Sequence, residues 1–240
     1  MQEIGDKAGE GATLNNISQI YDARGDYPAS LKYLVQSLYI RQEIGDKAGE
    51  GTTLNNIGKV YHLKGDYVAA LPWYNQSLRI RQQLGDKAGE GTTLNNIGEI
   101  YRTQGDSITA MKYLEQSLRI TQDIGDKKLE GVTLNNMSLI YDARGDHTTA
   151  LKYLEQSLCI RQEIGDKAGD AETSWNIGLA YADQNYLSKA EPYIRHAVQL
   201  AEELDHPALE QFRKALADIR AKIRGRTSLF ARLVQSLRGR

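Results

Sequence analysis

The sequence predicts an all-α protein built from stacked helix hairpins, and three observations support this fold class. Residues 45–58 and 85–98 are identical, and the same block returns with substitutions at Gly5, Gly125 and Gly165, which gives a period of 40 residues. Internal repeats of about 20 to 50 residues are typical of proteins made of stacked structural units. Gly-Asp pairs divide each period in half, and the apolar residues between the pairs recur at helical spacing.

The Gly-Asp pairs are interpreted as the junctions between helices. Glycine adopts the left-handed conformation that ends many helices, and a following aspartate accepts hydrogen bonds from the free N–H groups of the next helix. Each repeat is therefore expected to hold an A helix and a B helix of about 18 residues, roughly 27 Å long. The pairs begin at Gly5, Gly25, Gly45, Gly65, Gly85, Gly105, Gly125, Gly145 and Gly165.

The second repeat shows why the hairpins must stack. Each of its helices carries one apolar stripe, and a two-helix hairpin cannot cover both stripes, so neighbouring repeats must bury them for each other. Gly58 lies inside the A helix, where glycine costs about 1 kcal/mol relative to alanine. A close approach between helices at Gly58 is expected to compensate. The stripes are Leu54, Ile57, Val60 and Tyr61 in the A helix, and Ala70, Trp73, Tyr74, Ser77, Leu78 and Ile80 in the B helix.

The first four repeats keep this pattern closely, and residues 1–204 are assigned to five repeats. Residues 1–4 end in Gln-Glu-Ile, which matches Gln42–Ile44 at the end of a B helix. The chain is therefore expected to open on the tail of a preceding helix, either as a fragment of a longer array or as an array whose first repeat is lost.

The fifth repeat departs from the pattern. Ser174 and Trp175 replace the Leu-Asn pair, and Asn185 and Tyr186 replace Gly-Asp. Residues 205–240 are accordingly predicted to form a degenerate sixth repeat and C-terminal capping helices with a basic tail.

Two helices are expected in this C-terminal region. The first covers residues 206–224, with Pro207 in the first turn, where its missing N–H group does little harm. Residues 227–238 are predicted to form a degenerate B helix, because Leu233–Leu237 repeats Leu34–Leu38 letter for letter.

The C-terminal tail is basic. Residues 219–240 contain seven Arg or Lys residues and no acidic residue. Cations are favourable near helix C-termini, so a solvated cap explains this composition, and docking on an anionic surface is the alternative. Loss of phospholipid or acidic-partner binding on deletion of residues 226–240 would support docking.

The repeat resembles the tetratricopeptide repeat, lengthened by six residues beyond the usual period of about 34. The matching residues, in order, are Leu54, Ile57, Gly58, Tyr61, Gly65, Ala70, Tyr74 and Ser77. The long variant resembles kinesin light chains, which share Leu-Asn-Asn in the A helix and Ala-x-Pro at Ala70–Pro72 and Ala190–Pro192. It also resembles the Leu-Gly-Asn-repeat adaptors, which share the 40-residue period and the junction sequence Gly-Asp-Lys-x-Gly-Glu. The resemblance covers residues 5–204. It implies that the fold is a right-handed superhelical solenoid of about six repeats.

Composition restricts the class of protein. A net charge of −1 gives no overall field to attract nucleic acid. The single cysteine, Cys159, precludes an internal disulfide and favours a reducing compartment. No apolar run approaches the roughly 18 residues needed to span a bilayer, and no secretory signal follows Met1. A cytoplasmic location is therefore predicted.

No catalytic constellation is visible, and the chain is predicted not to be an enzyme. The histidines show no metal-ligand spacing, and no phosphate-binding loop or strand to carry one is found. No cofactor and no metal are expected. The four histidines are His62, His147, His196 and His206.

The resemblance implies that the A helices line a concave inner face that binds peptides. At this face each A helix carries paired asparagines, whose amides can hydrogen-bond the backbone of an extended peptide. The alternative is that one asparagine of each pair ties adjacent helices together. The first of each pair, such as Asn55, is favoured over the second, such as Asn56, as the ligand contact. The predicted peptide-binding residues are Asn15, Asn16, Asn55, Asn56, Asn95, Asn96, Asn135, Asn136 and Asn176.

Two further A-helix positions vary between repeats and are predicted to set specificity. While the scaffold positions barely change, the ninth and twelfth positions differ in charge and size from one repeat to the next. Drift on an unused surface would also produce such variation. The predicted specificity residues are Gln19, Asp22, Lys59, His62, Glu99, Arg102, Leu139 and Asp142, and the fifth repeat has Leu179 and Ala182 at these positions.

The predicted function is a protein-interaction scaffold that binds an extended or helical segment along the inner groove. Asn55 stands where the relatives that clamp the acidic chaperone tail have lysine, so binding of that tail is not expected. Two alternatives remain: a sensor or regulatory arm of a larger signalling protein that binds a small molecule, and a structural array that self-associates through its repeat ends. The sequence does not identify the partner.

Overall fold

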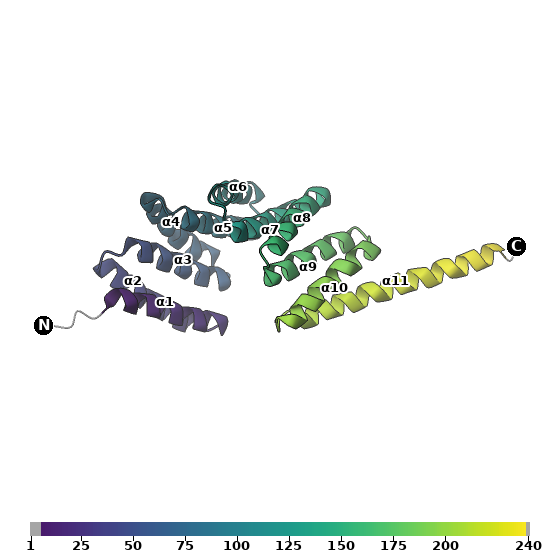
Figure 1. Cartoon of the computed structure of the whole chain (residues 1–240), viewed down its shortest axis with the longest axis horizontal. Coiled ribbons are helices and arrows are strands. Elements are labelled where there is room, and N and C mark those ends of the chain that lie inside the picture. Colours follow the sequence, from purple (N-terminus) through teal and green to yellow (C-terminus); the bar gives the residue numbers. More distant parts are fainter. Residues whose placement is uncertain (1–5, 239–240) are drawn as a thin grey trace. The chain divides into compact units, whose positions relative to one another are not determined.

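The computed structural model describes the backbone of residues 6–238 and the side chains of residues 6–225. All regular structure in these residues is α-helical, which confirms the predicted fold class. The helices, labelled in Figure 1, are α1 (Lys7–Ala23), α2 (Tyr27–Glu43), α3 (Lys47–Leu63), α4 (Tyr67–Leu84), α5 (Lys87–Thr103), α6 (Ser107–Ile124), α7 (Lys127–Ala143), α8 (His147–Glu163), α9 (Lys167–Asp183), α10 (Leu187–Glu203) and α11 (Leu209–Arg238).

The Gly-Asp junctions have the predicted conformation. The junction glycines from Gly25 to Gly165 have φ between 68° and 82°. The aspartate that follows accepts a hydrogen bond from the N–H group three residues later, as from Gly49 to Asp46 Oδ1 at 2.9 Å. Where glycine is missing, Asn185 takes the same left-handed conformation, with φ of 66°.

The caps provide a first test of these junctions. Asp66 caps α4 by accepting the Ala69 N–H at 3.0 Å. Asp66→Ala is expected to lower the free energy of unfolding by about 1 kcal/mol, because one helix-opening N–H loses its partner. Tyr186 opens α10 without a side-chain cap bond, so Tyr186→Ala should cost only about 0.5 kcal/mol through its exposed contact with Lys189. Urea unfolding of both variants checks this, and equal losses would contradict the capping role.

The chain divides into two compact units, Met1–Asp126 and Lys127–Arg240, which are described separately. In the first unit, α1 pairs with α2, α3 with α4, and α5 with α6, while α2 packs on α3 and α4 on α5. In the second unit, α7 pairs with α8 and α9 with α10, while α8 packs on α9 and α10 on α11. Each described hairpin is therefore covered by its neighbour within the unit, as the sequence predicts.

The core of the first unit lies between successive repeats. Leu34 of α2 is buried against Ile57 and Val60 of α3. One repeat later, Tyr74 of α4 is buried against Ile97 and neighbouring residues of α5. Because the apolar stripe of each A helix contacts the preceding B helix, adjacent repeats stabilise each other.

The glycine inside the A helix allows the predicted close approach. A Cβ atom at Gly58 would lie 2.8 Å from Cδ1 of Tyr74, and one at Gly98 would lie 2.8 Å from Cγ of Leu114. Such distances are too short for carbon atoms in contact. At these two positions the missing side chain therefore leaves room for Tyr74 and Leu114 of the partner helix.

An arginine near the end of each of three B helices, buried in two of them and half-buried in α4, makes a second set of repeated contacts. In the second unit, Arg161 of α8 donates from Nε to Ser157 at 3.3 Å and from Nη1 to Asp166 at 2.9 Å. Ser157 in turn donates to the carbonyl of Gly131 in α7 at 2.8 Å. A Cβ atom at Gly169 would overlap the Arg161 guanidinium. The same arrangement is formed by Arg41 with Gly49 and by Arg81 with Gly89.

The C-terminal region differs from its prediction. Helix α11 begins at Leu209 and continues to Arg238 without a break at Gly225. The prediction of a separate B helix over residues 227–238 is therefore wrong. Arginine follows Gly225, so the sequence offers no aspartate at that point to cap a new helix.

The start of α11 covers the end of the second unit. Phe212 is buried and stacks on Trp175 of α9, with ring centroids 4.3 Å apart. Ile194 and Ala197 of α10 and Leu216 of α11 belong to the same core cluster. Trp175 thus occupies the position of the first asparagine of the other repeats, and its ring packs on an aromatic side chain of α11.

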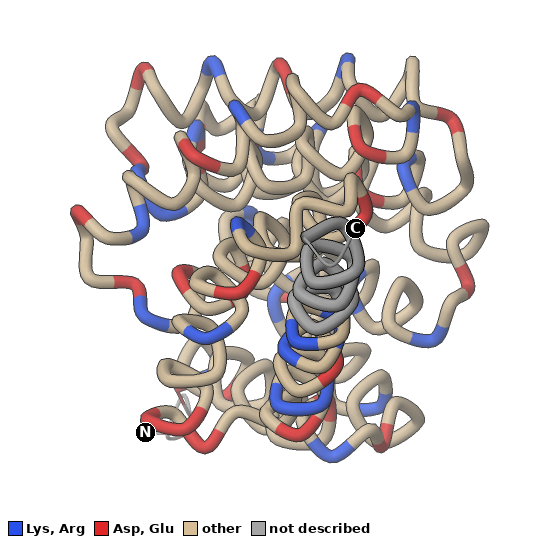
Figure 2. Tube along the Cα trace, turned by 90° about the vertical axis from the view of Figure 1, so that its right-hand side faces the viewer, with Lys and Arg blue, Asp and Glu red and all other residues tan. Residues whose placement is uncertain are grey.

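Two predictions fall on other parts of the chain. The match of residues 1–4 to the end of a B helix lies outside the described residues, and so do the side chains of the basic tail, residues 226–240. Within the described part of α11, Arg213 pairs with Glu202 and Glu210, and Arg220 pairs with Glu191. Figure 2 shows basic residues, in blue, along the described part of this helix. Of the helices described, none combines the length and apolar character that crossing a bilayer requires.

Candidate functional site: the inner face of the A helices

Within each unit the A helices lie side by side. Helix α1 contacts α3, and α3 contacts α5, in addition to the contacts that each makes with B helices. In the second unit α7 contacts α9 in the same way. On one side of these A–A contacts, side chains spaced three or four residues apart on each A helix form a surface, here called the inner face. In the first unit it comprises Ala12, Asn16 and Gln19 of α1, Thr52, Asn56 and Lys59 of α3, and Thr92, Asn96 and Glu99 of α5.

The paired asparagines connect neighbouring A helices. Asn56 Nδ2 donates to Asn15 Oδ1 at 2.9 Å, and Asn96 Nδ2 donates to Asn55 Oδ1 at 3.2 Å. In the second unit Asn176 Nδ2 donates to Asn135 Oδ1 at 2.9 Å. In each of these three bonds, the second asparagine of one repeat donates to the first asparagine of the repeat before it.

The two asparagines of a pair have different surroundings. The first members, Asn15, Asn55, Asn95 and Asn135, are buried. Asn55 Oδ1 also lies 3.4 Å from the Thr93 hydroxyl. Among the second members, Asn16 is exposed, Asn56, Asn96 and Asn176 are half-buried, and Asn136 is buried. The first asparagines thus hold helices together, and the more accessible amide belongs to the second.

The specificity positions of the first unit are polar and accessible. Gln19 and Lys59 are exposed and Glu99 is half-buried. His62 Nε2 lies 3.9 Å from Glu99 Oε1, so an ion pair joins α3 to α5 when the histidine is protonated. Burial raises the pKa of the nearby Tyr74 hydroxyl well above its usual value, and the negative charge of Glu99 adds a smaller increase.

Two other specificity positions contain polar atoms without partners. The buried atoms Asp22 Oδ1 and Arg102 Nε make no hydrogen bond within the described residues. Buried polar atoms are usually paired, because leaving one unpaired costs about 1 to 3 kcal/mol. Asp22 Oδ1 and Arg102 Nε are therefore exceptions to this rule within the described residues.

The inner face of the second unit is less polar. It comprises Val132, Asn136 and Leu139 of α7 and Glu172, Asn176 and Leu179 of α9. Leu139 is half-buried and Leu179 is exposed. Oδ1 of Asp142, the remaining specificity residue, lies 2.8 Å from Nδ1 of His147 in the same hairpin and accepts a hydrogen bond from it when that nitrogen carries a proton.

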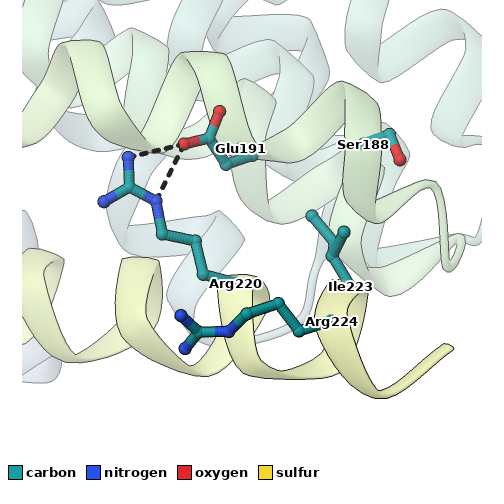
Figure 3. Close-up of a pocket in the computed structure, with 5 residues that line it drawn as sticks. All are labelled: Ser188, Glu191, Arg220, Ile223 and Arg224. Atoms are coloured by element: carbon teal, nitrogen blue, oxygen red, sulfur yellow. Dashed lines mark hydrogen bonds and ion pairs between the residues drawn. The ribbon is translucent and has the colours of Figure 1, made fainter. Parts of the chain in front are cut away.

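A hollow of about 430 Å³ lies away from the inner face, between α10 and α11. Figure 3 shows its residues: Arg220 binds Glu191 through Nε at 3.0 Å and Nη2 at 2.7 Å, while Arg224, Ser188 and Ile223 complete the lining. The ion pair fastens α11 to α10.

Among the described residues no cluster of His, Cys, Asp or Glu is arranged to hold a metal ion. Cys159 is exposed.

The sequence analysis identified the asparagine pairs and gave a tie between adjacent helices as the alternative to ligand binding, and the bonds between Asn56 and Asn15 and between Asn96 and Asn55 are such ties. The bonded asparagines are 41 residues apart, one more than the period. The threonines Thr52 and Thr92, one helical turn before Asn56 and Asn96, were not predicted as site residues.

Comparisons with known proteins agree with this geometry. The family model described as the tetratricopeptide repeat matches residues 9–83, 49–123, 89–163 and 129–203. No curated protein sequence gives a significant match.

Three solved structures show the same fold. BtubC (BKLC) from P. vanneervenii is 21% identical, with a TM-score of 0.70 over 83% of this chain and 84% of that chain. The putative kinesin light chain repeats of Podosopora anserina are 14% identical, with a TM-score of 0.61 over 80% and 95%. NprR, solved in complex with its cognate peptide NprX, is 20% identical, with a TM-score of 0.68 over 91% of this chain and 62% of NprR. The chain thus spans less than two thirds of NprR.

Proposed function

This chain belongs to the tetratricopeptide repeat family, and from that premise we propose that it is a non-catalytic scaffold that binds a peptide segment of a protein partner on the inner face. The observation that carries the proposal is the orientation of the second asparagines. Asn56 and Asn96 each spend one N–H group on the preceding helix. Their Oδ1 atoms have no partner within the described residues, so each amide is held in place with an acceptor and a donor still available.

Such fixed amides suit the backbone of an extended peptide. Packed helices lie about 8 to 10 Å apart, and an extended chain advances about 3.3 Å per residue. One asparagine can therefore bind one peptide group in about every three residues of the ligand. Because the amides do not contact ligand side chains, this binding is independent of ligand sequence.

The neighbouring specificity positions supply sequence preference. Lys59 and Glu99 favour charged ligand side chains of opposite sign in the first unit, whereas Leu139 and Leu179 favour apolar ones in the second. NprR, which has this fold, binds a peptide. In this proposal the second asparagines contact the ligand, and the first asparagines hold them in position. The preference for Asn55 over Asn56 is therefore reversed.

A displayed library of random, unstructured peptides provides ligands for a test. Asn56→Ala combined with Asn96→Ala is expected to weaken a selected peptide by about 1 to 3 kcal/mol, because peptide groups lose their partners. Isothermal titration calorimetry measures this loss, and circular dichroism checks helicity.

Two controls separate binding from stability. Asn75 is exposed on the B helix α4, so Asn75→Ala should leave affinity unchanged. Asn15→Ala combined with Asn55→Ala removes the bonds between helices and should lower thermal stability more than affinity. Selected peptides that bind the Asn56/Asn96 variant as tightly as the wild type would refute the proposed site.

A further inference from the structure

Helix α1 exposes an edge that later A helices bury. Ile20 is 53% exposed, whereas Val60 and Ile100, one and two repeats later, are fully buried. Ile17 is half-buried, and its equivalent Ile57 is buried. The edge of α1 thus presents apolar side chains that every other described repeat of the first unit covers with a B helix.

The helix that covers this edge in the next repeat has a defined pattern. Leu34 of α2 is buried against Ile57 and Val60, and Leu31 and Leu38 pack beside it. The edge of α1 repeats the surface that α2 contacts on α3. Its complement is therefore a helix with apolar side chains at the spacing of these three leucines.

Two B-helix positions beside the edge are both apolar in the first repeat and in no later repeat. Val35 and Tyr39 are exposed, and the corresponding residues of the second repeat are Asn75 and Arg79. Together with Leu14 and their neighbours they line a hollow of about 490 Å³. Large exposed apolar patches usually mark interaction surfaces.

The C-terminal sequence supplies the complementary pattern. Leu233–Leu237 is identical to Leu34–Leu38, and no other B helix contains this pentapeptide. In the same register, Phe230 corresponds to Leu31. The backbone of α11 remains helical to Arg238 (Figure 1), beyond the residues that line the hollow between α10 and α11.

The register also extends to the buried arginine. Arg240 corresponds to Arg41, which binds Asp46 and lies against Gly49. Helix α1 has the matching acceptor. Gly9 occupies the place of Gly49, and within the described residues the Asp6 carboxylate accepts only the Gly9 N–H.

We propose that residues 229–240 of one copy dock on the α1 edge of a second copy, in the way that α2 docks on α3. The contact is head-to-tail, so it joins different surfaces of the two copies and produces rings or open filaments rather than a closed pair. It uses the outer edge of the first repeat and not the inner face, and is therefore independent of the proposed peptide binding.

Sedimentation velocity of the 240-residue chain across a concentration series tests this. The wild type should exceed the monomer mass of 26.8 kDa as concentration rises. Ile20→Asp and Leu233→Asp should each weaken association by about 100-fold, because each buries an unpaired carboxylate. Gly9→Leu should weaken it too, by filling the space for Arg240. The matched control is Val68→Asp, since Val68 is exposed on α4 away from the edge, and it should associate like the wild type.

Mixing the two monomeric variants gives the decisive result. Ile20→Asp retains an intact C-terminal segment and Leu233→Asp retains an intact edge, so the mixture should form a heterodimer and no larger species. A synthetic peptide of residues 224–240 should bind the wild type and not Ile20→Asp, which tests the contact even if Leu233→Asp disturbs α11. A wild type that stays monomeric, a Leu233→Asp variant that still associates, or a mixture without heterodimer would each overturn the proposal.

Discussion

Gly169→Leu is expected to destabilise the second unit by about 3 to 5 kcal/mol, the cost of breaking a buried ion pair by displacing one partner. The added side chain would occupy the position of the Arg161 guanidinium. Arg161 would then lose its bonds to Asp166 and Ser157. The Arg161 side chain is only 4% exposed, so water cannot replace these bonds where it now lies.

The chain itself suggests the compensating change. At the two equivalent positions of the preceding junction it has Thr121 and Leu129 in place of arginine and glycine. Combining Arg161→Thr with Gly169→Leu copies that pair. The double variant should recover at least half of the loss, because leucine is a good helix former and no buried charge remains.

Denaturant unfolding measures the free energy of unfolding of Gly169→Leu, of Arg161→Thr and of the double variant, and hydrogen exchange reports the protection of α9 amides in each. The matched control is Arg119→Thr, since Arg119 is 75% exposed and lies 3.9 Å from Glu115. This variant should lose less than about 1 kcal/mol. If the two single-variant losses simply add in the double variant, the arginine and the glycine do not depend on each other.

The sequence was sufficient to predict features that depend on neighbouring residues. The junctions at Gly45 and Gly65 were predicted correctly because a left-handed glycine and a capping aspartate act within one turn. The stripe containing Ile57 was predicted from helical periodicity, and the close approach at Gly58 from the cost of a mid-helix glycine. These arguments need no knowledge of how the helices cross.

Other features depend on packing between helices and were not predicted. Asn55 and Asn56 are adjacent and chemically identical, and only the position of the next A helix decides which is buried. The space filled by Arg41 explains Gly49, although the sequence carried a signal in the joint change to Thr121 and Leu129. The continuity of α11 through Gly225 was missed because a glycine alone costs a helix only about 1 kcal/mol, and the missing aspartate was not weighed.

Phe212→Ala is expected to lower the stability of the second unit by about 3 to 5 kcal/mol, the usual cost of truncating a buried aromatic side chain. Phe212 stacks on Trp175 and His206, and it belongs to the core cluster with Ile194 and Leu216. Its loss leaves a cavity between α9, α10 and α11 that the rigid helices cannot close.

The effect should be local, because each repeat contacts chiefly its neighbours. Hydrogen exchange should show that amides of α10 and of residues 209–225 lose protection, while α3, α4 and α5 keep theirs. Ile108→Ala serves as the control: Ile108 is 80% exposed on α6, so its truncation should change stability by less than about 0.5 kcal/mol. Equal loss of protection in both units would show that the chain unfolds as one cooperative body, and α11 would then stabilise the whole array rather than cap its end.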